Sequence, residues 1–108
     1  MAEAPGWIAT NTSGANAAVT ATKAAVAGST HVVYSITASF AAAADLATLT
    51  LKDDTTTIGI FDVHAGENNS WVFPKGILIT SGNKIDAVLG AGGSGVGHIN
   101  IHGTTLQR

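Results

Sequence analysis

Apolar and polar residues alternate with a period of two through most of this 108-residue sequence. The alternation is typical of β-strands that turn one face to a core and the other to solvent. It is clear at Leu49 and Leu51, which are separated and flanked by Thr and Lys, and at Ile99 and Ile101, which alternate with His98, Asn100 and His102. In residues 31–40, one predicted face carries Val32, Tyr34, Ile36, Ala38 and Phe40. A change of face after Ile60 predicts a bulge near residues 59–62.

Turn-forming residues separate these runs, including Gly28-Ser29, Asp53-Asp54 and Ser81-Gly82-Asn83. The predicted strands are 16–24, 31–40, 46–52, 56–64, 70–74, 76–80, 84–90 and 96–103. About eight short, regularly spaced strands predict an all-β fold, a single-domain antiparallel β-sandwich of jelly-roll type. The Ala-rich stretches 16–27 and 41–47 have helical propensity. Interspersed Thr and Val favour a strand for the first, and whether the second forms one helical turn inside a loop stays open.

The first fifteen residues show no period and contain Pro5, Gly6 and Gly14. They predict an irregular N-terminal arm over residues 1–15, followed by a β-sandwich domain over residues 16–108. Trp7 and Ile8 are the large apolar side chains of this arm beyond Met1. Two interpretations of Trp7 stay open: the side chain folds back onto its own sandwich, or it docks into a neighbouring subunit.

Charged residues make up only 11% of the chain, against about 25% in an ordinary soluble domain. Four Lys and one Arg do not form the basic stripe of a nucleic-acid binder, and the many β-branched residues argue against disorder. The sequence has no Cys and no apolar run of 18 residues, and no secretion signal is visible in its first 25 residues. A surface of Thr, Ser, Asn, Gly and Ala instead indicates contacts between subunits.

Four His residues raise the possibility of a metal site. On a strand, however, His98 and His102 are about 13 Å apart, too far to share one ion within a chain. The more economical interpretation is a polar ladder of His98, Asn100 and His102 on an outer or inter-subunit face. No metal and no cofactor is therefore expected.

Motifs for catalysis are lacking or lie in the wrong context. The run from Gly90 to Gly95 formally matches G-x-G-x-x-G, but a strand follows it where a dinucleotide site requires a helix. No G-x-S-x-G elbow is present, and no pair of carboxylates is convincing. Trp71 and Phe73 are expected in core or edge packing. We therefore expect no enzyme, no catalytic residue, and interface roles for Trp7, Ile8, His98, Asn100 and His102.

The strand-and-turn texture resembles a group of small virion proteins of tailed bacteriophages and prophages over roughly residues 16–105. The residues that carry the resemblance are Leu49-Thr50-Leu51-Lys52-Asp53, Ile58-Gly59, Phe61, Val63-His64, Phe73-Pro74, Gly82-Asn83, Ala87, Leu89, the run Gly92 to Gly97, and Gly103. Similar proteins are β-sandwich modules that decorate or cement a capsid, often as trimers, or belong to tail appendages.

The resemblance implies a capsid decoration or cement protein that forms a homo-oligomer, with a trimer favoured. Its expected partner is the major capsid protein or another virion protein, with no nucleic acid and no membrane. The implied location is the virion, assembled in the host cytoplasm. Two alternatives stay open: a receptor- or glycan-binding module at a tail or cell surface, and a jelly-roll metalloenzyme.

Overall fold

The computed structural model describes residues 6–15, 17–40, 47–64, 68–91 and 96–107. These residues form eight β-strands and contain no helix, and hence none that is long and apolar enough to cross a membrane. The strands are β1 (Trp7–Ala15), β2 (Val19–Lys23), β3 (Ser29–Phe40), β4 (Ala47–Asp53), β5 (Thr56–Val63), β6 (Asn69–Leu78), β7 (Ile85–Leu89) and β8 (Val96–Gln107). The predicted all-β antiparallel sandwich is confirmed.

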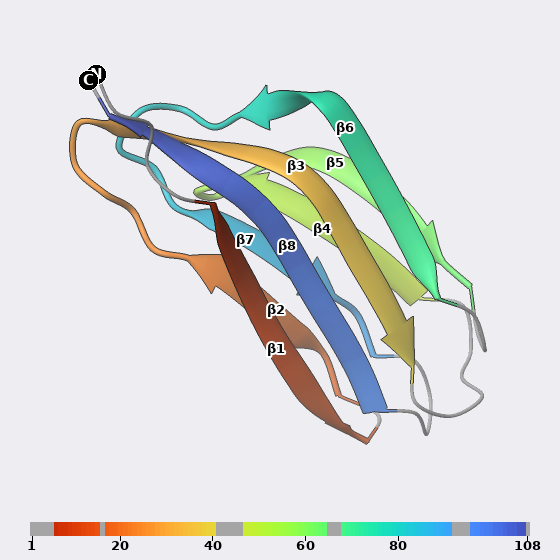
Figure 1. The fold of residues 1–108 in the computed structure, drawn as a ribbon. Coiled ribbons are helices and arrows are strands. Elements are labelled where there is room, and N and C mark those ends of the chain that lie inside the picture. The colour runs from red at the N-terminus through yellow and green to blue at the C-terminus, as the bar shows by residue number, and fades with distance from the viewer. Residues whose placement is uncertain (1–5, 16, 41–46, 65–67, 92–95, 108) are drawn as a thin grey trace.

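The strands form two four-stranded antiparallel sheets, packed face to face as two layers (Figure 1). One sheet has the order β1-β8-β3-β6 and the other has the order β2-β7-β4-β5. The pairs β1·β8, β2·β7, β3·β6 and β4·β5 are nested, so the chain is one long hairpin whose strand pairs alternate between the two sheets. This rolled hairpin is the jelly-roll topology.

The core lies between the sheets and is built from the alternate residues that the period-two pattern selects. Its largest fully buried apolar side chains are Ile36, Leu49, Leu51, Ile79, Ile85, Leu89, Ile99, Ile101, Val33 and Val63. Ala21, Ala38, Ala47 and Ala87 fill inward positions between them. Each fully buried Leu, Ile or Val contributes about 1.5–3 kcal/mol of transfer free energy, so these residues supply the main stabilisation.

Strand β3 departs from the simple alternation that the sequence predicts. Val33 pairs with Gly103 and Ser35 with the next residue, His102, which leaves Tyr34 as an extra residue in a bulge. The bulge reverses the faces, so Val33 and Ile36 both belong to the core. The predicted face that joined Val32 and Tyr34 to Ile36 is therefore wrong before residue 35.

A second irregularity lies in β5, one position before the predicted bulge at 59–62. Leu51 pairs with Gly59 and Lys52 with Thr57, so Ile58 is the extra residue. Beyond it, Phe61 and Val63 turn inward while Ile60 remains exposed on the outer face.

The predicted strands 70–74 and 76–80 are one strand, β6. Val72 pairs with Ser35 and Ile77 with Val33, so residues 73–76 leave the regular pairing. Gly76 has φ of 76° and lies against Val32 and Tyr34, where a Cβ atom would clash.

The N-terminal segment corrects another prediction. Residues 7–15 are not an irregular arm but the edge strand β1, which pairs with β8 from Trp7↔Gly103 to Ala15↔Val96. The inward side chains of β1 include Ala9 and Ser13, which are too small or too polar to produce an apolar period. Of the Ala-rich stretches, the first contains β2, while residues 41–46 of the second lie outside the described residues.

The turn after β4 is fastened to the connection between β6 and β7 by the Asp53 carboxylate. Thr80 donates to Oδ2 of Asp53 from its backbone N (2.9 Å) and its hydroxyl (2.7 Å), and Asn83 Nδ2 donates to Oδ1 at 2.8 Å. Partial burial raises the pKa of Asp53, but the hydrogen bonds from Asn83 and Thr80 outweigh this and lower the pKa below its ordinary value. The ionised carboxylate therefore holds the two turns together.

Acid should weaken this connection. Because the pKa of Asp53 is lower in the folded than in the unfolded chain, its contribution to stability is complete above the unfolded pKa and is lost as pH falls through the folded pKa. We expect Asp53→Asn to reduce the loss of unfolding free energy below about pH 4, measured by urea denaturation across pH. Asp54→Asn is the matched control, since Asn tolerates the positive φ at this position (56°), and it should retain the wild-type acid dependence. An acid dependence unchanged in Asp53→Asn would contradict the role of this carboxylate.

Candidate functional site

The three polar residues predicted on β8 lie on the outer face of the β1-β8-β3-β6 sheet. His98, Asn100 and His102 alternate with Ile99 and Ile101, which are completely buried. Asn100 Nδ2 donates to Thr37 Oγ1 at 3.1 Å, and Thr12 Oγ1 lies 3.3 Å from His98 Nδ1. The side chains of β8 are thus linked to outward residues of both neighbouring strands.

Strand register extends this ladder into rows that cross the sheet. The rows are Thr12–His98–Ser39, Thr10–Asn100–Thr37–Ser70 and Ile8–His102–Ser35–Val72. We call these eleven residues the outer face. They are hydroxyl, amide, imidazole and aliphatic side chains, with no Lys, Arg, Asp or Glu among them.

A shallow depression of about 320 Å³ lies at one end of this face. It is lined by Thr37, Ala38, Ser39, Asn68, Asn69, Ser70 and Asn100. Its polar groups are hydroxyls and amides, which form hydrogen bonds but do not act as a nucleophile with a base at neutral pH. The depression suits a neutral hydrogen-bonding group.

Exposed large apolar side chains occupy the other end of the same sheet surface. Ile8 is 66% exposed, Val72 67% and Leu78 61%. Ile8 and Val72 stand at the two ends of one row, on the two edge strands β1 and β6. The outer face shares one feature with the centre of a protein interface, which is the depletion of charged residues.

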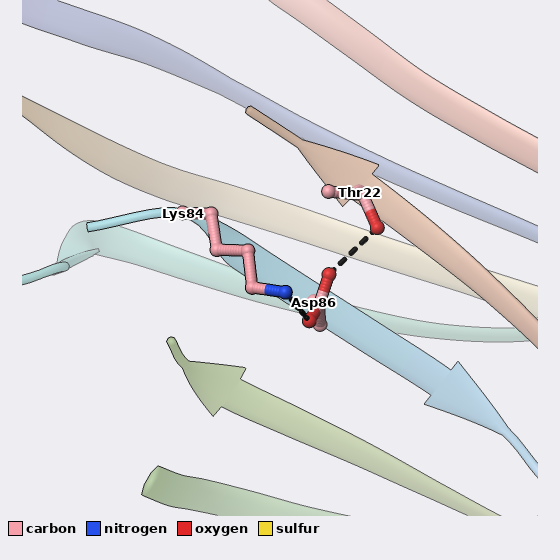
Figure 2. Close-up of polar contacts among 3 residues, drawn as sticks. All are labelled: Thr22, Lys84 and Asp86. Atoms are coloured by element: carbon pink, nitrogen blue, oxygen red, sulfur yellow. Dashed lines mark hydrogen bonds and ion pairs between the residues drawn. The ribbon is translucent and has the colours of Figure 1, made fainter. Parts of the chain in front are cut away.

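The opposite surface, on the β2-β7-β4-β5 sheet, carries charged groups. Asp86 accepts a hydrogen bond from Thr22 Oγ1 at 2.6 Å and forms an ion pair with Lys84 Nζ at 3.1 Å (Figure 2). Lys52 pairs with Asp86 in register, and Asp62 is exposed on β5. Ile60 is also exposed here, at 67%. This surface thus carries charged side chains that the eleven residues of the outer face lack.

Trp7 folds back onto its own sandwich, which decides between the two interpretations of this residue. Its ring packs edge-on against His31 at 5.8 Å, and Lys23 Nζ lies 5.5 Å from its centroid. Trp7 Nε1 donates to Thr105 Oγ1 at 3.0 Å. Gly103 faces the indole across the strand pair, where a Cβ atom would clash with it.

His31 is completely buried beside this contact, and its two ring nitrogens are bonded. Nε2 lies 2.8 Å from the carbonyl oxygen of Ala24, which only accepts, so Nε2 carries a proton. In the neutral ring, Nδ1 then accepts from the Thr105 hydroxyl at 2.8 Å. The hydroxyl joins Trp7 on β1 to His31 on β3 through β8.

Trp71 and Phe73 also face inward. Phe61 of β5 lies 5.0 Å from Trp71 and 6.0 Å from Phe73 between ring centroids, and all three pack against the core. Trp71 is therefore half-buried and offers no free ring for stacking on a sugar.

The described residues contain no group of three His, Asp or Glu side chains close enough to hold a metal ion. His31 is a buried structural residue, whereas His64 is exposed.

Sequence reasoning missed Thr105, His31 and Val72. Neither Thr105 nor His31 belongs to a sequence motif, and these two hydrogen-bonded residues are 74 positions apart in the chain. The outward position of Val72 was overlooked because its neighbours Trp71 and Phe73 drew attention as core residues. The alternation that turns these two aromatic residues inward also turns Val72 outward.

A scan against protein-family models finds no match for this sequence, and a search of curated proteins finds none either. Solved structures of similar shape include the core domain of Drosophila NLP, described in terms of pentamer formation and histone binding. That match has 21% identity and a TM-score of 0.48 and covers 93% of this chain and 98% of that one.

PliG of Aeromonas hydrophila, a periplasmic inhibitor of g-type lysozyme, matches with 14% identity and a TM-score of 0.43 over 94% of this chain and 87% of that one. The Gx strain of infectious bursal disease virus has 13% identity and a TM-score of 0.37, over 97% of this chain and 33% of that one. The similar structures thus include a virus structure and a pentamer-forming protein, but at these identities and scores no functional argument rests on them.

The bridge through Thr105 makes a specific prediction. Thr105→Val keeps the shape of the side chain but leaves Trp7 Nε1 and His31 Nδ1 without partners, which should lower the free energy of unfolding by about 1–3 kcal/mol. Thr104→Val, at the adjacent half-buried position, is the matched control and should change it by less than about 0.5 kcal/mol. Equal effects of the two substitutions in urea denaturation would refute the bridge.

For the exposed apolar side chains we expect only a small change in the stability of the monomer, in contrast to Thr105. Ile8→Ser and Val72→Ser should change the unfolding free energy of the monomer by less than about 0.5 kcal/mol, because both side chains are mostly in solvent. Ile101→Ala, in the core, should cost about 2–5 kcal/mol in the same dilute denaturation assay. A large cost for either Ser variant would mean that these side chains stabilise the monomer itself.

Proposed function

We propose that this protein is a non-enzymatic structural subunit of a virus particle, a capsid decoration or cement protein of a tailed phage that bridges neighbouring subunits of the shell. The observation that carries the proposal is the difference between the two sandwich surfaces. The eleven residues of the outer face include no Lys, Arg, Asp or Glu, and Lys75 is exposed beyond them on the interrupted part of β6, while the opposite sheet carries Lys52, Asp62 and Asp86.

Desolvation explains why an uncharged face suits a structural contact. Removing an unpaired charge from water costs several kcal/mol, whereas hydroxyl and amide groups lose much less when they find partners across an interface. The exposed Ile8, Val72 and Leu78 add apolar area that gains free energy on burial.

The chemistry of the described residues supports a role without catalysis. An active site needs convergent groups such as a nucleophile with a base, or an acid with a perturbed pKa in a cleft. The depression on the outer face holds hydroxyls and amides, and Asp53, whose pKa is lowered, has its carboxylate engaged with Thr80 and Asn83 in a turn.

The location in a virion follows from the sequence resemblance to small phage virion proteins. A cement protein stabilises a shell through many repeated weak contacts, which multivalency adds together. We propose the major capsid protein or another virion protein as its partner, and a small homo-oligomer as its assembled form.

A second candidate function, a receptor- or glycan-binding module, is favoured by one observation. The depression lined by Asn and Ser or Thr side chains offers donors and acceptors of the kind that bind a neutral polyhydroxylated ligand. Since Trp71 is half-buried against Phe61, Asn100→Ala is the discriminating variant. Glycan binding that disappears in Asn100→Ala would favour this function over the first.

Deletion of the gene from a phage that encodes it tests the first proposal. Particles without the protein should assemble but lose infectivity faster on heating or in low salt, and added purified protein should restore resistance. Mutant particles that are as robust as the wild type, or purified protein that does not bind to them, would refute the role.

A further inference from the structure

We infer that two copies of this chain pack through the outer faces of their β1-β8-β3-β6 sheets, around a two-fold axis that runs parallel to the strands between β8 and β3. The inference deepens the proposed function, on which it rests, by naming the partner that covers the uncharged face. The occupant is a second copy of the same chain.

The strand order makes this arrangement self-complementary. A two-fold axis along the strands keeps each row in its place and reverses the order of strands, so β1 lies over β6 of the partner and β8 over its β3. In the row Ile8–His102–Ser35–Val72, Ile8 then faces the partner subunit's Val72. The same operation places Val72 against the partner subunit's Ile8.

The two-fold pairing forms the contact between Ile8 and Val72 twice, once on each side of the axis, and so buries two of the most exposed apolar side chains of each copy. Ile8 and Val72 are 66% and 67% exposed in the monomer, and each is matched to the other by position alone. In the next row, Asn100 faces the partner subunit's Thr37, and Thr10 faces the partner subunit's Ser70. Hydroxyls and amides both donate and accept, so they form hydrogen bonds across such an interface.

The twist between packed sheets does not disrupt this match. Aligned sheets cross at about 30°, and β1 and β6 lie about 7 Å from the axis when strands are 4.8 Å apart. The crossing therefore displaces Ile8 relative to its partner by about 4 Å, which is less than the ~7 Å between successive outward rows.

The available area reaches the lower limit of a specific interface. Four strands, about 19 Å wide in total, over about 27 Å of β8 give roughly 500 Å² on each copy, or about 1,000 Å² in all. Specific interfaces exceed about 1,000 Å². A dimer of this size is weak on its own, as expected for a contact that is repeated in a larger assembly.

The edges of the sheet are less suited to pairing between copies. Asn11 covers the gap between the edge strands, since its Oδ1 accepts from the backbone N of Thr12 (2.9 Å) and its Nδ2 donates to the carbonyl of Thr20 (2.9 Å). At the opposite edge, Pro74 and Gly76 interrupt β6. The outer face is thus a better surface for a second copy than either edge.

Engineered disulfides test the geometry directly, because the sequence contains no Cys. Ile8→Cys and Val72→Cys proteins, mixed and oxidised, should form a disulfide-linked heterodimer, as facing sheets allow such bridges. Either variant oxidised alone should form at least tenfold less covalent dimer, because two copies of the same position lie on opposite sides of the axis. A dimer formed by Ile8→Cys alone would indicate pairing of β1 edges, and no preference for the mixture would overturn the inference.

A charge placed at the centre of the face gives a second test. Thr37→Lys should weaken self-association at least tenfold in analytical ultracentrifugation, since two unpaired charges would be buried near the axis. Thr48→Lys, an equally exposed Thr on the opposite sheet, is the control and should leave it unchanged. Thermal unfolding of dilute protein checks that both variants fold.

These tests separate the dimer from the proposed function. If Thr37→Lys associates as the wild type does but the protein still binds and stabilises phage particles, the two-fold contact is wrong and the virion role stands. If the mixed disulfide forms but particles are unaffected by deletion of the gene, the contact stands and the virion role is wrong.

Discussion

The register of strand β8 constrains both the core and the outer face, because this inner strand is hydrogen-bonded along both edges, to β1 and to β3. Its inward side chains, Ile99 and Ile101, are completely buried, and its outward side chains form the centre of the outer face. Period two makes these two roles inseparable, since a slip of one residue would exchange the Ile pair with His98, Asn100 and His102. The same register that builds the core therefore sets the rows of the candidate interface.

The two open sides of the sandwich are closed by different chemistry. Between the edge strands β5 and β6, three aromatic rings pack together, with Phe61 against Trp71 and Phe73. Near β1, a polar bridge joins Trp7, Thr105 and His31, and every donor and acceptor in it has a partner. Gly103 lies beside this bridge, where a Cβ atom would clash with the carbonyl oxygen of Val32 and with the indole of Trp7.

The sequence was sufficient for the fold class and for the strands whose alternation is regular, such as β4, β7 and β8. It failed where the period is interrupted or concealed. A bulge at Tyr34 shifts the core face of β3 from odd positions before it to even positions after it, and nothing in the residues 31–40 marks the place. In β1, the inward Ala9 and Ser13 leave no apolar period, and only pairing with β8 makes the segment a strand. Of the residues predicted at an interface, Ile8, His98, Asn100 and His102 share one surface, while Trp7 does not because its indole donates into the bridge.

The structure shows where on the surface the charged residues are lacking. With seven acidic and five basic residues, charges could have been spread over both surfaces, yet the eleven residues of the outer face include none. Exposed aliphatic side chains also stand at both ends of one row of this face, where solvent gives them no stabilisation and a symmetric copy would. Ile60 on the charged surface has no exposed aliphatic counterpart, since its row continues through Thr50 and the half-buried Val88 to Thr20.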